Sequence, residues 1–297
     1  MSILVDKKTR LLIQGITGKE GMRACHESLS YGTKVVAGVT PGKGGQKVEK
    51  VPVYDTVARA MQKHPDINAT FITVPAPFVK DAAFEAIHAN IPLIVILTEH
   101  VPTLDSAWIV ARARIAGVTV IGPSAIGIIS PGKAKIGSIG TAEMKRGFTP
   151  GAVGVISKSG GMTSEICFAL TAAGLGQSTA VGMGGDVIAG SSFADILALF
   201  AKDPETKAVA MFAEVGGSYE EEAAAFIKKT KFKKPVVAII AGAFGAALPE
   251  NTVLGHAGAI VSRGRGGYHS KVRALKEAGV MLANTVEEIP ILLKKKL

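Results

Sequence analysis

The sequence is poor in cysteine, in aromatic residues and in long apolar runs. Its two cysteines, Cys25 and Cys167, form no CxxC pair and cannot build a disulfide framework, so we expect a reducing, cytoplasmic setting. Aromatic residues make up only 5% of the 297 residues, too few for the stacking platforms that single-stranded nucleic acids need. The longest uncharged run, 235–249, is too short to span a bilayer, and the charged first ten residues lack the apolar segment of a signal peptide. We expect a soluble chain that binds neither membranes nor nucleic acid.

Three common ligand-binding motifs are also absent. The first glycine-rich loop, Gly15–Gly21, has GxxGxxG spacing, and no acidic residue follows the expected second strand, 34–39, both of which disfavour an NAD-dependent dehydrogenase. The loop Gly38–Gly45 lacks the spacing and the hydroxyl residue of a Walker A motif. None of the six histidines shows HxH or HExxH spacing, so we expect no metal site.

Glycine is the residue in excess. The 35 glycines, together with a hydrophobic share of 47% and a net charge of +10, indicate a globular chain with many tight turns or with backbone that approaches a ligand closely. The positive charge favours an anionic partner, such as a phosphate-rich small molecule, without identifying it.

Short β-branched runs alternate with helical patterns, as is typical of parallel βαβ units in an α/β fold. We expect strands at 11–14, 34–39, 70–74, 93–97, 118–121, 152–157, 179–182, 208–214, 235–241 and 280–283. We expect helices at 79–89, 106–116, 162–173, 193–202, 219–229, from 258 onward and at 286–297. The rhythm breaks between Ser130 and Gly151, which we interpret as a linker between two similar halves. Parallel sheets bind ligands at the carboxyl ends of their strands, so the loops there are the candidate sites.

Two glycine-rich loops of the first half suit an anion. In Gly15–Gly21, glycines expose backbone amides at a helix start, and Thr17 and Lys19 add donors, although a turn that binds nothing fits equally well. Lys43, among the glycines of Gly38–Gly45, offers a point charge to an anionic ligand or is a solvated turn lysine.

Two further loops follow strands of the first half. Residues 74–78 contain Pro75 and Pro77, which either stiffen an apolar wall suited to an adenine ring or simply begin a helix. Residues 97–99 (Leu97, Thr98, Glu99) either bond a ligand or cap a helix.

The second half contributes an anion cradle and a histidine. In 157–165, hydroxyls and amides converge on one helix start, a pattern compatible with simple capping. His256 stands among Gly and Ala in 255–259, which leaves room for a phosphoryl group, although single histidines are more often structural. Glu214 ends an expected strand and lies before two glycines. It is either a carboxylate that orients an imidazole or simply a polar residue at a strand end.

Together these segments resemble the α subunit of succinyl-CoA synthetase over essentially the full chain. The resemblance is carried by 15–21, 38–45, 74–78, 184–186 (Gly-Gly-Asp), 214–217 (Glu-Val-Gly-Gly) and 255–259. It implies a Rossmann-like CoA-binding domain over 1–129, a linker over 130–150 and a flavodoxin-like, doubly wound ligase domain over 151–297.

The resemblance also implies the site residues and the chemistry. The CoA contacts map onto Thr17, Gly18, Lys19, Glu20, Lys43, Pro75, Leu97, Thr98 and Glu99. The phosphorylated histidine maps onto His256, with Glu214 as its carboxylate partner. The acid and phosphate site maps onto Ser159, Gly160, Gly161 and Ser164. ATP or GTP with Mg²⁺ is expected on an ATP-grasp β subunit, in an αβ or α2β2 assembly. The implied reaction joins succinate to CoA through a phosphohistidine and an acyl phosphate.

The sequence departs from this family at the acid site. Ser164 stands where the family has tyrosine, and Gly160-Gly161-Met162 is more like ATP-citrate lyase and citryl-CoA synthetase. A bulkier acid, citrate or malate, is therefore the alternative to succinate. A non-catalytic CoA-binding module is disfavoured because the histidine and its small neighbours are present.

Overall fold

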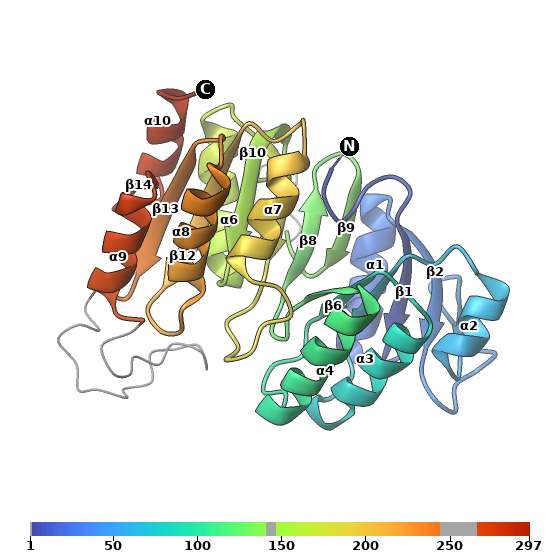
Figure 1. The fold of residues 1–297 in the computed structure, drawn as a ribbon. Helices are drawn as coiled ribbons and strands as arrows, with labels where there is room; N and C mark the ends of the chain where they lie inside the picture. The colour runs from blue at the N-terminus through green and yellow to red at the C-terminus, as the bar shows by residue number, and fades with distance from the viewer. Residues whose placement is uncertain (1, 141–146, 244–265) are drawn as a thin grey trace.

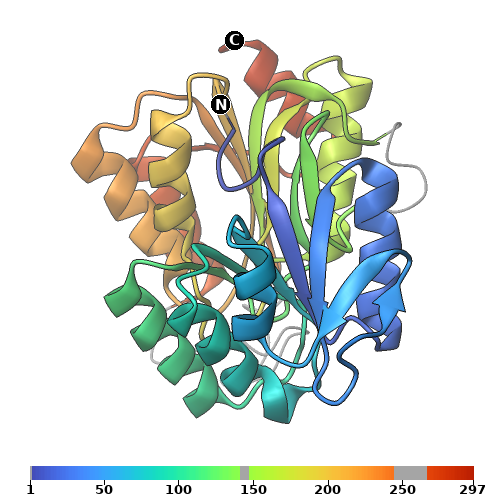
Figure 2. The ribbon, with the colours of Figure 1, turned by 90° about the vertical axis from the view of Figure 1, so that its right-hand side faces the viewer.

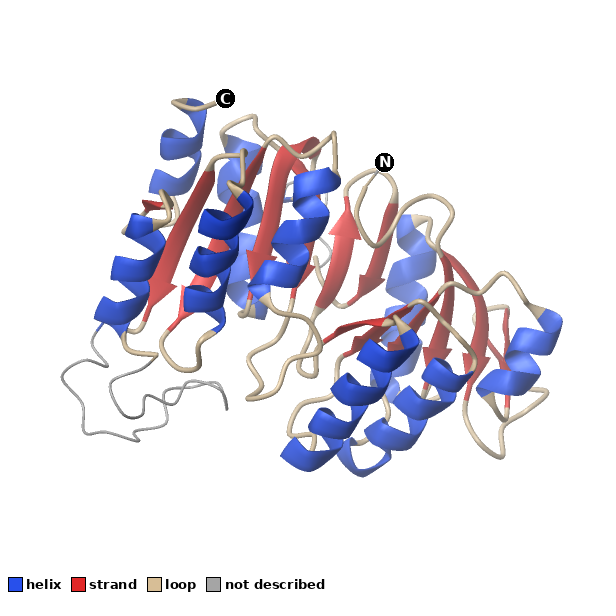
Figure 3. Cartoon of the chain, viewed as in Figure 1, coloured by secondary structure: helices blue, strands red, loops and turns tan. Residues whose placement is uncertain are grey.

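The computed structural model describes residues 2–140, 147–243 and 266–297, which form two sheets with helices on both faces (Figures 1 and 3). The strands of the first sheet are β1 (Arg10–Gln14), β2 (Lys34–Val39), β3 (Lys47–Val48), β4 (Val51–Tyr54), β5 (Ala69–Ile72), β6 (Leu93–Ile96) and β7 (Thr119–Ile121). Those of the second are β8 (Gly127–Ser130), β9 (Ala134–Gly137), β10 (Pro150–Ser157), β11 (Gln177–Gly182), β12 (Ala208–Glu214), β13 (Val236–Ala241) and β14 (Met281–Leu282).

The first sheet has the Rossmann strand order. Within the described residues its order is β3-β4-β2-β1-β5-β6-β7, parallel except for β3, which pairs antiparallel with β4. Without β3 this is the 3-2-1-4-5-6 order, whose strand sequence reverses between β1 and β5. A ligand site is expected at that point, beyond the carboxyl ends of β1 and β5.

The second sheet contains the flavodoxin strand order. Among the described strands the order is β14-β13-β12-β10-β11-β8-β9, and its parallel part, read from β11 to β14, is the 2-1-3-4-5 order. The order reverses between β10 and β12, which end at Ser157 and Glu214. The predicted fold class, Rossmann-like followed by flavodoxin-like, is confirmed.

Helices cover both faces of each sheet. They are α1 (Lys19–Tyr31), α2 (Val57–Lys63), the short 3₁₀ helix η1 (Ala76–Phe78), α3 (Val79–His88), α4 (Thr103–Ala116), α6 (Gly160–Ala172), α7 (Phe193–Lys202), α8 (Tyr219–Thr230), α9 (Tyr268–Glu277) and α10 (Glu288–Lys294). Leu11 and Ile13 face the core that contains α1, whereas Leu12, between them, faces α2, α3 and α4. In the second half α7, α8 and α9 pack on one face, and α6 and α10 contact each other on the other (Figure 1). Among the described residues, no helix combines the length and apolar character needed to cross a bilayer.

Helix α7 shows how the local sequence specifies an element. Ser192 and Asp195 form a capping box at its start, so each side chain bonds the other's backbone amide. Phe193, Ile196, Leu197 and Phe200 follow at helical spacing and are all fully buried. The prediction of a helix at 193–202 is confirmed because capping and periodicity agree.

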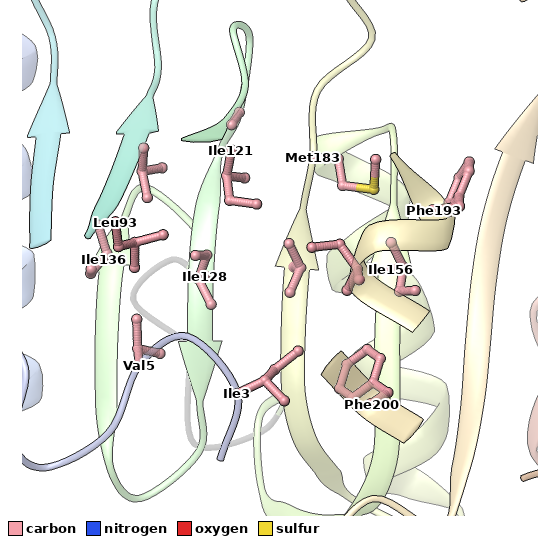
Figure 4. Packing of buried hydrophobic residues seen from close by; sticks show 14 of the residues in the cluster. Ile3, Val5, Leu93, Ile121, Ile128, Ile136, Ile156, Met183, Phe193 and Phe200 are labelled. Atoms are coloured by element: carbon pink, nitrogen blue, oxygen red, sulfur yellow. The ribbon is translucent and has the colours of Figure 1, made fainter. Parts of the chain in front are cut away.

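One hydrophobic cluster joins the two halves. It includes Leu93 of β6 and Ile121 of β7 from the first sheet, and Ile156 of β10 and Phe193 of α7 from the second. Figure 4 shows Ile3 and Val5 of the N-terminal segment within the same cluster. The halves therefore pack into a continuous core. The turned view in Figure 2 shows the ribbons of the two halves next to each other.

Residues 130–150, expected as a linker, contain strand β9 and contribute the ends of β8 and β10. β8 pairs antiparallel with β11, and β9 with β8, so this hairpin extends the second sheet. β9 also packs against α1 of the first half, where the fully buried Lys135 donates from Nζ to Oε2 of Glu27 at 2.8 Å. Thr33 Oγ1 accepts from the backbone amide of Lys135 and donates to the backbone carbonyl of the same residue, each at 2.8 Å. The domain boundaries at 129 and 151 stay a prediction.

Candidate functional site

A pocket of about 710 Å³ lies at the strand-order reversal of the first sheet, within the usual size range of small-molecule sites. The loops after β1, β2 and β5 line it together with the start of α3. Its wall includes Gly15, Thr17, Thr40, Val74, Pro75 and Phe78. Phe78 is a large apolar side chain that is 61% exposed here, which suits a flat apolar ligand group.

The glycine loop brings the start of α1 against β1. A Cβ on Gly21 would lie 2.2 Å from the carbonyl oxygen of Gly15, so only glycine allows this approach. Gly18 is the N-cap of α1 and offers no capping side chain. The first amides of α1 are therefore donors suited to an anion at the pocket, where Gly18 forms part of the wall.

The other predicted residues of this loop lie around the same helix start. Thr17 contributes its hydroxyl to a 3.2 Å hydrogen bond with Thr40 Oγ1, which joins the loops after β1 and β2. Lys19 is exposed and Glu20 half-buried, both in the first turn of α1, and Lys43 is exposed in the turn after β2. Lys43 does not line the pocket. Its side chain is exposed to solvent, close to the part of the pocket wall that follows β2.

The loops after β5 and β6 are fastened together. Thr98 donates from Oγ1 to the Val74 carbonyl at 2.6 Å, and Leu97 donates its amide to the Ile72 carbonyl at 3.0 Å. Pro75 is the N-cap of η1 and lines the pocket. Glu99, by contrast, is exposed, so of the 97–99 segment Thr98 has the clearest connection to the pocket wall.

The hydroxyls and amides of the predicted anion cradle lie at the start of α6. Ser159 is its N-cap and accepts from the Met162 amide at 3.4 Å, while Ser157 Oγ accepts from the Ser159 amide at 3.1 Å. Gly160 packs against Ile126, since a Cβ there would lie 2.5 Å from Cγ2 of that side chain, whereas a Cβ on Gly161 would meet nothing within 4 Å. The helix start is therefore tightly fixed on one side and open on the side of Gly161. Ser164 is half-buried one turn further along α6.

Glu214 ends β12 beside this cradle. Lys158, between Ser157 and Ser159, donates its amide to the Phe212 carbonyl at 3.4 Å, so the loop after β10 lies next to the end of β12. Glu214 is 8% exposed. His256, its predicted partner, lies outside the described residues.

Sequence reasoning missed a set of charges beneath this loop, of which three are buried and Glu221 is half-buried. It is here called the Glu220 cluster: Lys158, Glu220, Glu221 and Lys271. Glu220 Oε1 lies 3.0 Å from Lys158 Nζ, Glu220 Oε2 pairs with Lys271 Nζ, and Glu221 Oε2 lies 3.3 Å from the same lysine nitrogen. The run of three glutamates at 220–222 has the pattern of a solvated helix start, so it gave no signal. Lys158 lies within the predicted cradle segment, but nothing in the sequence marked its side chain as buried.

Neither cysteine is a reactive thiol. Burial, with the nearby Glu49 carboxylate, raises the pKa of Cys25 to about 11, and burial alone raises the pKa of Cys167 further. Both therefore stay protonated near neutral pH. Among the described residues, the chemistry of the site rests on hydroxyls, amides, carboxylates and lysines.

Comparisons with known proteins agree with the two halves of the fold. Residues 6–100 match the family described as CoA binding domain, and residues 156–281 match the family described as CoA-ligase. The first match spans the strands β1 to β6 and their glycine loops, and the second runs from the last two residues of β10 to the first residue of β14.

Similar proteins extend along the whole chain. The chain is 47% identical over 289 residues to the ADP-forming succinate–CoA ligase subunit alpha 2 of Archaeoglobus fulgidus, covering 97% of both chains. It is 48% identical over 282 residues to the subunit alpha of Methanothermobacter thermautotrophicus, covering 95% of this chain and 92% of that one. The structure of ATP citrate lyase from Methanothrix soehngenii in complex with citrate and coenzyme A superposes with a TM-score of 0.91 at 26% identity. That superposition covers 99% of this chain, which spans about half (51%) of the lyase chain.

Proposed function

The chain belongs to the family of succinate–CoA ligase alpha subunits, and we propose that it is the alpha subunit of an NDP-forming acid–thiol ligase. The observation that carries this proposal is the arrangement of two sites on one core: a pocket with a helix start at the switch point of the first sheet, and an anion cradle beside Glu214 at that of the second. A CoA ligase needs both, one for the cofactor and one for phosphoryl transfer.

We assign the first pocket to CoA. The amides at the start of α1 supply donors for CoA phosphates, with Thr17 beside them and Lys19 and Lys43 as exposed cations nearby. Pro75 and Phe78 form a flat apolar wall suited to the adenine ring. Glu20 and the Leu97–Glu99 segment complete the proposed contact set.

We assign His256 as the phosphorylated residue and Glu214 as the carboxylate that orients it. The reaction then has three balanced steps. The imidazole nitrogen of His256 displaces NDP from NTP and takes the phosphoryl group; a carboxylate oxygen of the acid takes that group from the imidazole, giving an acyl phosphate; and the CoA thiolate displaces phosphate from the acyl carbon. Splitting the transfer in this way conserves the energy of the phosphoanhydride bond.

The cradle supplies the electrostatics of the phosphoryl steps. A phosphohistidine is anionic, and the amides at the start of α6 with the Ser159 hydroxyl hold such charge without mobile counter-ions. Gly160 and Gly161 let that backbone approach the transferred group closely.

We also propose the partner and the setting. A β subunit of ATP-grasp type is proposed to bind ATP or GTP with Mg²⁺, in an αβ or α2β2 assembly, and the buried free cysteines suit a cytoplasmic location. The acid is proposed to be succinate, with citrate or malate as the alternative that Ser164 and Gly160-Gly161 favour. The similarity in fold to a lyase solved with citrate supports keeping that alternative.

Phosphate labelling tests the mechanism. The chain assembled with its β subunit and given radiolabelled NTP and Mg²⁺ is expected to acquire an acid-labile, base-stable label that His256→Ala abolishes. His269→Ala is the matched control, because His269 is an exposed histidine of α9. Equal labelling of the His256→Ala and wild-type chains contradicts the phosphohistidine.

Hydroxamate trapping with succinate, malate and citrate tests the acid. One acid is expected to dominate, and Ser164→Tyr is expected to shift the preference toward the smallest because it removes volume from the site. Equal turnover of all three acids by the wild-type enzyme contradicts the role given to Ser164.

A further inference from the structure

Glu220 joins three separate elements of the second half at one carboxylate. It lies in the first turn of α8, its side chain is fully buried, and Oε1 accepts from Lys158 Nζ at 3.0 Å and from the Glu214 amide at 3.5 Å. Its second oxygen pairs with Lys271 of α9, which is also fully buried. One side chain thus contacts the cradle loop, the strand end that presents Glu214, and α9.

The two lysines are fixed by more than this pairing. Lys158 Nζ lies 5.4 Å from the ring centroid of Tyr219 and 5.9 Å from that of Phe193, both within cation–π range. Lys271 Nζ also donates to the Gly217 carbonyl at 3.0 Å, in the turn that follows Glu214. The Glu220 cluster therefore holds both flanks of Glu214: its amide directly, and the following turn through Lys271.

Hydrophobic residues of similar size would pack this region at no electrostatic cost, since taking two lysines and a glutamate out of water is unfavourable unless the ions are well paired. Such a cluster gives directional contacts that apolar packing lacks. Here those contacts end on the backbone and loop that form the proposed phosphoryl-transfer site.

We propose that Glu220 and Lys158 are positioning residues for phosphoryl transfer. Through Lys158, Glu220 sets the position of the Ser159–Gly161 cradle, and through its bond to the amide it sets the position of Glu214. This inference rests on the proposed function of the cradle and of Glu214. The proposal assigns neither residue a contact with substrate, because Glu220 is completely buried and the Lys158 ammonium, in a side chain that is 6% exposed, is paired with it.

Single-turnover labelling of the assembled enzyme with NTP and Mg²⁺ tests this proposal. In Lys158→Met the stem stays over the two rings and Glu220 keeps its pairing with Lys271, so the fold is expected to persist. The labelling rate is expected to fall by roughly 10- to 100-fold, the scale expected of a small misplacement in a catalytic site. Lys158→Arg is expected to recover most of the rate, and CoA affinity is expected to stay unchanged in both variants because CoA is assigned to the first sheet.

Two comparisons separate positioning from other roles. Lys228→Met is the matched control, because it removes an exposed lysine whose 3.0 Å ion pair with Glu277 joins the same helices, α8 and α9. Glu220→Gln keeps the shape and removes the charge; it is expected to slow labelling as Lys158→Met does. Hydrogen exchange is expected to rise at 157–161 and 212–217 in Lys158→Met and not in the control.

The outcomes are distinguishable. If the wild-type chain takes no label, the proposed function fails and this inference with it. If the wild-type chain is labelled and Lys158→Met matches it in rate and in exchange, only the positioning role is overturned. If Lys158→Met is slow while a folded Glu220→Gln labels at the wild-type rate, Lys158 acts by itself and the role of Glu220 is overturned.

Discussion

The approach of α1 to β1 predicts a specific effect of Gly21→Ala. The added Cβ would lie 2.2 Å from the Gly15 carbonyl oxygen and 2.7 Å from the Ile16 Cα. Both atoms are backbone, so no side chain rotation relieves the clash and the start of α1 has to move away from the loop. That displacement withdraws the α1 amides from the pocket to which we assign CoA.

The magnitude follows from two opposing terms. Overpacking of this kind typically costs about 1–3 kcal/mol, and replacing glycine by alanine inside a helix returns about 1 kcal/mol. Because the clash is with two backbone atoms, we take the upper end of that cost and expect a net loss of about 2 kcal/mol in the free energy of unfolding. For a chain of this size such a loss lowers the melting temperature by about 3 °C. Loss of even one charge-assisted contact to a phosphate, about 1.4 kcal/mol, weakens CoA binding about tenfold.

Thermal unfolding and calorimetric titration with CoA measure the two effects. Gly161→Ala is the stability control: it also adds a methyl to a helical glycine, but the new Cβ meets nothing within 4 Å, so its melting temperature is expected to stay the same or rise slightly. A Gly21→Ala chain that melts and binds CoA like the wild type would refute the argument that this glycine sets the position of α1.

Three further predictions concern Lys135, the two cysteines and Ser159. Burial lowers the pKa of Lys135 although Glu27 hydrogen-bonds it, so Glu27→Gln is expected to destabilise by about 1.5–3 kcal/mol at pH 7. Because the pKa of this buried lysine is lowered in the folded chain, the unfolded chain binds more protons than the folded one. The difference in unfolding free energy between the variant and the wild type is therefore expected to shrink as pH rises toward the ordinary lysine pKa. Cys25 and Cys167 are expected to resist a thiol reagent at pH 8 until the chain is unfolded. Ser159→Ala is expected to destabilise by about 1 kcal/mol through loss of the α6 cap and to slow labelling of the assembled enzyme.

Each of these predictions has a contrary result. For the first, thermal unfolding at pH 7 and pH 10 is compared with Glu277→Gln, which breaks an exposed ion pair; a deficit that does not change with pH contradicts the buried lysine. For the second, rapid reaction of either thiol in the folded chain contradicts its burial. For the third, wild-type stability of the Ser159→Ala chain contradicts the role of Ser159 as the cap of α6. A wild-type labelling rate contradicts its role in the cradle.

Much of the fold follows from local pattern. The strands at 34–39 and 208–214 and the helix at 193–202 have the predicted bounds, because apolar runs and capping signals mark their ends clearly. The glycine loops also lie where they were predicted, at the carboxyl ends of β1, β2 and β10. Parallel sheets place such loops together, so periodicity alone locates the candidate sites.

The hairpin of β8 and β9 was not predictable in this way. Its strands are four residues each and lie among Gly, Pro and Lys, so local pattern favours a linker. Gly127 and Gly137 pair across it, and a Cβ on Gly127 would lie 2.0 Å from the Ile136 carbonyl oxygen. These glycines allow the backbones of the two strands to approach closely. In the sequence alone, glycines at such positions are interpreted as turns.

The Glu220 cluster was missed for a different reason. The glutamates at 220–222 occupy a first helical turn, where negative charge is favourable next to the helix dipole even in full solvent. Only the packing of α8 against α9, and of α9 against β13, determines that Glu220 points inward to Lys158 and Lys271. Burial of a charge depends on partners distant in sequence, and a single sequence does not reveal them.

The hairpin has a consequence for how the chain can be divided. Its strands belong to the second sheet by hydrogen bonding, while Lys135 bonds Glu27 of α1 and Thr33 just beyond that helix. The N-cap of α1, Gly18, forms part of the wall assigned to CoA. A fragment that ends at residue 129 exposes the β9-facing side of α1, and one that begins at residue 151 exposes the edge of β11. The two halves are therefore a poor choice for separate expression or for domain exchange with a relative, because moving the hairpin together with α1 keeps the contact with β9 but still exposes the edge of β11.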